Sequence, residues 1–107
     1  MLVIFLVAAA AGPQLQSYQS NDTLVPLCEQ QSVACVGYIE GISDMLSALA
    51  DRLPNTFGHL YCPPARVTPE TLRTKYLQHS RAHPEGGNYP AAESITDMLT
   101  STFPCTK

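Results

Sequence analysis

The segment that decides the fold of this chain is residues 32–54, which reads SVACVGYIEGISDMLSALADRLP. Its apolar residues recur at intervals of four, three, four, three and four, at Cys35, Ile39, Ile42, Leu46, Leu49 and Leu53. Because a helix turns once in about 3.6 residues, this spacing forms one apolar stripe. Ser32 is a favoured residue before a helix, and Pro54 cannot continue one. The segment therefore predicts an amphipathic helix that begins at Ser32 and ends before Pro54.

A second stripe of this helix consists of small residues, Ala34, Gly37, Gly41 and Ala48. A glycine inside a helix costs up to about 1 kcal/mol relative to alanine. A backbone or a bulky ring packed closely against Gly37 and Gly41 would account for that cost, and we expect Tyr38 to be a packing residue beside them. The close contact lies either within the chain, which we favour, or at an interface with a second molecule.

Three shorter helices are expected around this one, at about residues 21–29, 69–83 and 90–102. Asn21 or Asp22 is a suitable cap for the first of them, and Thr68 caps the second, with a proline and a glutamate in its first turn. Residues 53–64 and 83–90 are rich in proline and glycine and are predicted to be loops. No segment alternates like a strand. The expected fold class is all-α, a small four-helix, disulfide-stapled bundle.

The chain has four cysteines, Cys28, Cys35, Cys62 and Cys105. An even number in a short exported protein indicates disulfides, whereas a four-thiolate zinc site normally has two closely spaced pairs. On one continuous helix the Cα atoms of Cys28 and Cys35 would be about 10 Å apart, which is too far for a disulfide. In an up-down bundle Cys62 and Cys105 would lie at the same end, so we prefer Cys28–Cys35 with Cys62–Cys105, which requires a break between the first two helices. Cys28–Cys105 with Cys35–Cys62 remains open.

The N-terminal residues indicate export. Residues 1–12 form an apolar run without charged side chains that ends in small residues, as in a secretory signal peptide lacking its basic start. We expect cleavage near Ala10 or Ala11, a flexible lead-in at 13–20 and a single helical domain at 21–107, with no membrane span in the mature form. A formal charge of −3 with six Lys plus Arg gives no electrostatic basis for binding nucleic acid.

No pattern in the chain indicates catalysis, so we expect a binding protein, with no catalytic residue, cofactor or metal. The sequence contains neither a G-x-S-x-G nor an H-E-x-x-H motif. His79 and His83 would share a helix face, but no third metal ligand is evident. Two polar loops are the expected partner contacts, through Asn55, Phe57, His59 and Tyr61 in one and His83, Glu85, Asn88 and Tyr89 in the other.

Seven short motifs occur in an order that resembles the Rap/Tai family of type VI secretion immunity proteins. They are Cys35-Val36-Gly37-Tyr38-Ile39-Glu40-Gly41, Cys62-Pro63, Val67-Thr68, Tyr76-Leu77, His83-Pro84-Glu85, Ala91-Ala92 and Phe103-Pro104-Cys105. The resemblance implies a periplasmic helical protein that binds and inhibits a peptidoglycan amidase toxin delivered by a type VI secretion system. It also implies a possible homodimer.

The residues themselves leave another function open. A small periplasmic stress or chaperone-like binding protein would share the export signal, the disulfides and the absence of catalytic motifs. The three histidines would give such a protein a charge that responds to pH near neutrality.

Overall fold

The computed structural model describes residues 19–106. The expected signal peptide at 1–12 and residues 13–18 of the expected lead-in lie outside the described residues. In the described part the elements are α2 (Asn21–Glu29), α3 (Val33–Arg52), α4 (Pro54–Phe57), α5 (Pro69–Ala82), the 3-10 turn η2 (Pro84–Gly86) and α6 (Ala91–Thr102). With four longer helices, two disulfides and no strand among residues 19–106, the predicted all-α, disulfide-stapled bundle is confirmed.

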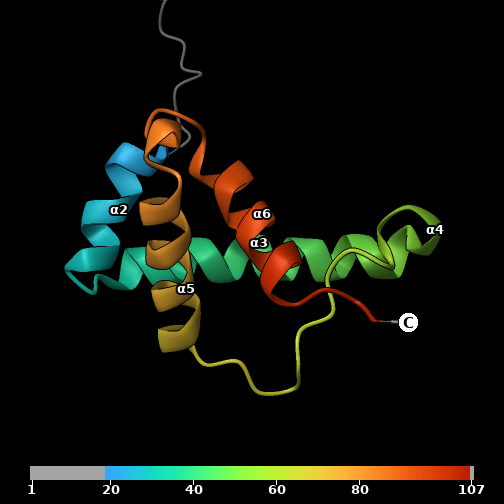
Figure 1. The fold of residues 1–107 in the computed structure, drawn as a ribbon. Helices are drawn as coiled ribbons and strands as arrows, with labels where there is room; N and C mark the ends of the chain where they lie inside the picture. Colours follow the sequence, from blue (N-terminus) through green and yellow to red (C-terminus); the bar gives the residue numbers. More distant parts are fainter. Residues whose placement is uncertain (1–18, 107) are drawn as a thin grey trace, which may run out of the picture.

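Helix α3 is the base on which the other helices pack (Figure 1). It contacts α2, α4, α5 and α6. Cys35, Ile39 and Leu46 of its apolar stripe are buried, and they meet core residues from the other long helices, Leu24, Cys28, Leu72, Tyr76, Leu77, Ile95, Met98 and Leu99. Leu53, the last residue of the predicted stripe, is instead 49% exposed, because the helix ends at Arg52 and the chain turns there.

Two helix starts are as predicted and two features are not. The hydroxyl groups of Ser32 and Thr68 cap α3 and α5, as expected. Helix α2 is capped by Ser20 rather than by Asn21 or Asp22, because Ser20 and Thr23 form a reciprocal capping box. The predicted loop at 53–64 contains the single turn α4, which begins at Pro54, since proline is favoured at a first helical position.

The disulfide between Cys28 and Cys35 crosses the break between α2 and α3, with a Cα–Cα distance of 5.0 Å. The break is a Schellman motif, in which the amide of Ser32 donates to the Leu27 carbonyl and the amide of Gln31 donates to the Cys28 carbonyl. Gln31 has φ 60°, a left-handed conformation that glycine usually occupies. The chain therefore reverses within a few residues, which is what the preferred pairing requires.

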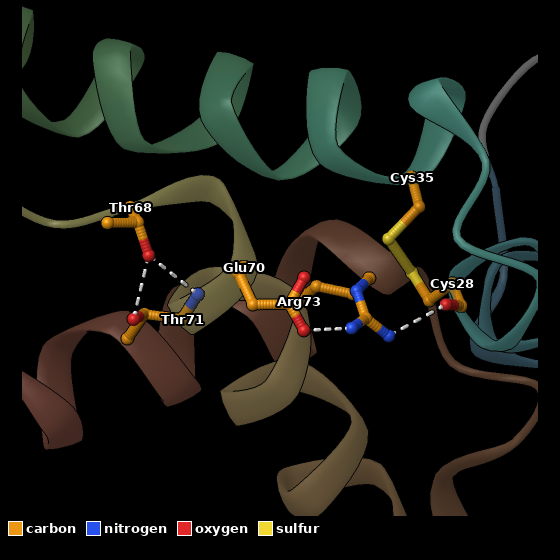
Figure 2. Close-up of polar contacts among 6 residues, drawn as sticks. All are labelled: Cys28, Cys35, Thr68, Glu70, Thr71 and Arg73. Atoms are coloured by element: carbon orange, nitrogen blue, oxygen red, sulfur yellow. Dashed lines mark hydrogen bonds and ion pairs between the residues drawn. A yellow bond between two sulfur atoms is a disulfide. The ribbon is translucent and has the colours of Figure 1, made fainter.

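Arg73 connects this reversal to α5. Figure 2 shows its guanidinium between the Glu70 carboxylate and the Cys28 carbonyl. The Arg73 Nη1–Cys28 O distance is 3.3 Å. A carbonyl at the end of α2 thus accepts from a cation on α5, an arrangement that the helix dipole favours.

The second disulfide joins Cys62 to Cys105, with a Cα–Cα distance of 4.9 Å, so the preferred set of pairings is confirmed. It ties the C-terminal segment to the loop after α4, and the amide of Cys62 donates to the Phe103 carbonyl at 2.9 Å. Unlike the buried first disulfide, this one is partly accessible, because Cys62 is exposed.

The close packing predicted at Gly37 and Gly41 is wrong for contacts within the described chain. Both glycines are exposed, and a Cβ atom built on either would meet nothing within 4 Å. Tyr38 is different, since it is half-buried and packs against the core. An interface with a second molecule remains a prediction for the glycines.

Of the described helices, α3 alone is long and apolar enough to cross a membrane, a criterion that the core helices of other proteins also meet.

Replacing Cys62 and Cys105 together with alanine will lower the free energy of unfolding by about 4 kcal/mol, because the bridge closes a long loop in the unfolded chain. Urea denaturation followed by circular dichroism will measure the loss. The exposed Thr106→Ala, beside Cys105, is the control and should change stability by less than about 0.5 kcal/mol. Equal stability of the double variant and the control would contradict this account of the bridge.

Candidate functional site

The side chain of Asn21 is the centre of a buried polar cluster. It is 6% exposed, so its amide lies in the core beside the hydroxyl of the fully buried Tyr76. Its Oδ1 accepts from the Tyr76 hydroxyl at 2.6 Å. Its Nδ2 donates to the Gly86 carbonyl and to Ser94 Oγ, both at 2.8 Å. One amide thus joins α2, α5, η2 and α6, and sequence reasoning missed it.

Tyr76 keeps a fixed role in this cluster. Its side chain is fully buried, and burial raises its pKa above the ordinary value for tyrosine. The hydroxyl therefore stays protonated across the physiological range and donates to Asn21 Oδ1, which leaves the Asn21 amide nitrogen directed at Gly86 and Ser94.

The backbone of the loop at 83–90 is held against the start of α2. The amide of Asn21 donates to the Tyr89 carbonyl at 3.1 Å, and the amide of Asp22 donates to the Gly87 carbonyl at 2.8 Å. On the other side of the loop, the amide of Ala91 donates to the Gln19 carbonyl at 2.8 Å. The first amides of a helix have no partner within that helix, so the loop satisfies them and is fixed in return.

The predicted contact residues of this loop point outward from a fixed backbone. His83, Glu85, Asn88 and Tyr89 are all exposed, and the Tyr89 ring lies against Gly86, where an added Cβ would come within 3.1 Å of it. Glu85 and Tyr89 also line a hollow of about 520 Å³ that extends to Asp97 on α6. We call these four residues the 83–89 surface.

His79 and His83 lie at the edge of this surface as a stacked pair, with ring centroids 4.4 Å apart. His83 Nδ1 donates to the His79 carbonyl at 2.9 Å, which caps the end of α5. Burial and then the nearby His83 lower the pKa of His79, while Asp97 opposes them. No group of three or more metal-ligating side chains occurs in residues 19–106, so the pair has no third ligand there.

The other predicted contact loop lies at a different end of the molecule, beyond the C-terminus of α3 (Figure 1). Asn55 and His59 are exposed and Phe57 is half-buried. Tyr61, predicted as a contact, is buried at 6% exposure, because its hydroxyl bonds to Ser43 Oγ at 2.6 Å and its ring packs edge-on against Phe103. The structure therefore does not bring the two loops into one surface.

A protein-family model matches the part of the sequence that contains the described helices and both disulfides. The model for Rap1a immunity proteins matches residues 13–105 of the sequence. The chain belongs to the Rap1a immunity protein family. No curated protein and no solved structure has significant similarity to it. Membership of the Rap1a family is consistent with a binding protein whose partner is a toxin. The expectation of an immunity protein is thereby confirmed at the level of the family.

In this Rap1a family member, Asn21→Ala will lower the free energy of unfolding by about 3 kcal/mol, because the buried groups that Asn21 satisfies lose their partner. Chemical denaturation will measure the loss. Asn88→Ala is the matched control, since Asn88 is exposed on the same loop, and should change stability by less than about 0.5 kcal/mol. Equal effects of the two substitutions would contradict the role of the cluster.

Acidification will destabilise the fold in part through His79. Because the pKa of His79 is lower in the folded state, the unfolded chain binds more protons as the pH falls through about 6.5, and stability declines until the folded pKa is passed. Thermal midpoints measured across this range should fall less in His79→Gln than in the unaltered protein. The exposed His59→Gln should keep the full decline; the same decline in His79→Gln would contradict the assignment.

Proposed function

We propose that this protein is an exported immunity protein that binds and blocks a peptidoglycan amidase toxin delivered into the periplasm by a type VI secretion system. Membership of the Rap1a family supports binding to a toxin. The two disulfides support an oxidising compartment such as the periplasm, and the apolar residues 1–12 support export to it. The order of the seven motifs supports the amidase as the target.

The observation that carries the proposed contact is the fixed backbone of the 83–89 surface. The loop is held at both sides by hydrogen bonds to residues 19–22 and from below by the Asn21 amide. A loop that is already ordered loses little conformational entropy when a partner binds, so more of its contact energy appears as affinity. This surface is therefore the better contact of the two loops predicted from sequence.

The side chains of the surface suit a protein interface. Tyr89 is 51% exposed, and an exposed tyrosine over a rigid backbone is a typical anchor residue. His83, Glu85 and Asn88 are exposed polar residues of the same loop, a type of residue typical of the rim of an interface. Because enzyme active sites are concave, a loop at the end of the helix group formed by α2, α5 and α6 (Figure 1) has a suitable position to block one.

If an amidase toxin is encoded by a neighbouring gene, Tyr89→Ala will weaken the complex with it by about 30-fold, because loss of an aromatic anchor costs about 2 kcal/mol. Isothermal titration calorimetry will measure the Kd, and co-expression will measure protection from lysis. Leu60→Ala is the control, since Leu60 is an exposed apolar residue at the α4 end, and should leave the Kd unchanged.

Two results would contradict different parts of this proposal. If no neighbouring amidase forms a complex and lysis continues, the immunity function is wrong and the stress-protein alternative gains support. If a complex forms but Leu60→Ala weakens it and Tyr89→Ala does not, the function stands and the contact surface is at the α4 end instead.

A further inference from the structure

The outward side of α3 has features that the fold of the chain does not explain. Its apolar and small residues are exposed, with Val33 at 83% and Met45 at 58%. Gly37 and Gly41 lie between them, and a Cβ atom added at either would meet no other part of the described chain within 4 Å, although each glycine costs about 1 kcal/mol in a helix interior. We call the exposed small and apolar residues the α3 outer face, namely Val33, Ala34, Gly37, Gly41, Met45 and Ala48.

A hollow of about 380 Å³ opens beside this face, between α3 and the chain that leads from Cys62 into α5. Glu40 and Asp44, one helical turn apart, stand exposed at its α3 side. Neither carboxylate forms an ion pair within residues 19–106. Like charges at this spacing destabilise a helix by about 0.2–0.5 kcal/mol, so this is a second unfavourable feature on the same side of α3.

The rest of the hollow is shaped and fixed by the fold. Tyr61 and Ser43 line it, and the 2.6 Å hydrogen bond between their hydroxyls holds the two walls together. Val67 and Leu72 add apolar surface. The neighbouring Cys62–Cys105 disulfide ties the loop wall to the C-terminal segment. The hollow thus has a mixed lining of apolar and polar groups, with two exposed carboxylates on its α3 side.

This combination matches one kind of side chain. Lysine and arginine pack an aliphatic stem against apolar surface, here Val67 and Leu72, and their cationic head forms charge-assisted hydrogen bonds with carboxylates. An anionic membrane surface does not fit, because Glu40 and Asp44 would face charges of their own sign. A second copy paired by a two-fold axis at Gly41 fits poorly, since the four carboxylates would be brought together.

We propose that the hollow binds an arginine or lysine side chain of a partner protein, and that the adjoining segment of that partner lies along the α3 outer face against Gly37 and Gly41. This site is separate from the proposed toxin contact. Leu72, in the hollow, is in the first turn of α5, whereas His79 is in its last turn and the 83–89 surface follows its end. The proposal therefore does not depend on the immunity function.

The test is an NMR titration of the isotopically labelled protein with a capped Ala-Arg-Ala peptide and with its citrulline counterpart, which has the same shape without the charge. The arginine peptide should cause saturable shifts at Ser43, Asp44 and Tyr61, and at Gly37 and Gly41 on the outer face. The citrulline peptide should not. Adding salt should weaken the binding, because exposed charges are screened.

Matched variants identify the carboxylates as the cause. Glu40→Gln with Asp44→Asn should weaken binding of the arginine peptide by about tenfold or more, since both charge-assisted contacts are removed. Asp51→Asn is the control, because Asp51 is exposed on the same helix and does not line the hollow. Its effect should be below twofold, since a more distant, exposed charge is screened.

Several outcomes would overturn the proposal. They are the absence of saturable shifts, equal binding of the citrulline peptide, or equal weakening by Asp51→Asn. Free arginine amide that binds as tightly as the peptide, without shifts at Gly37 and Gly41, would make the hollow a small-molecule site. A dimer in sedimentation that the peptide dissociates and that Glu40→Gln strengthens would assign the face to a second copy of the chain.

Discussion

The buried amide of Asn21 is the constraint on which the arrangement of α2, α5, α6 and the 83–89 surface depends. A primary amide in an apolar core is tolerated only when its hydrogen-bonding groups are satisfied. Here its oxygen accepts from Tyr76 and its nitrogen donates to Gly86 and Ser94. These short contacts can exist together only if the helices and the loop keep their relative positions, which apolar packing alone specifies less strictly.

The helices could be predicted from sequence because their signals are local. The stripe from Cys35 to Leu49, the cap at Thr68 and the prolines that follow helix ends act over a few residues. The preferred disulfide pairing followed from the expected up-down topology, which places Cys62 and Cys105 at one end, and local geometry showed that it requires a break between α2 and α3. What the sequence did not reveal is that Gln31 makes this reversal in a left-handed conformation.

The polar cluster could not be predicted in the same way, because its partners are distant in sequence. Ser20, Asn21, Asp22 and Thr23 are all residues that favour helix starts, so local reasoning could not tell which of them caps α2. Tertiary contacts decide, since Asn21 bonds to residues more than 50 positions away. The burial of Tyr61 was missed for a similar reason, because the contact with Phe103 that helps bury it depends on the return of the C-terminal segment.

The glycines of α3 mark the limit of what a single chain can explain. A stripe of small residues predicts the close approach of a backbone or a bulky ring, but it does not indicate whether that neighbour belongs to the same molecule. The described fold supplies no such internal neighbour, since a Cβ atom added at Gly37 or Gly41 would meet nothing within 4 Å. The side of α3 that carries them also bears Glu40 and Asp44 without ion-pair partners in residues 19–106. The glycines and the two like charges are each unfavourable for the helix, and they lie on the same exposed side. A bound partner that packs against the glycines and pairs with the carboxylates would compensate for both.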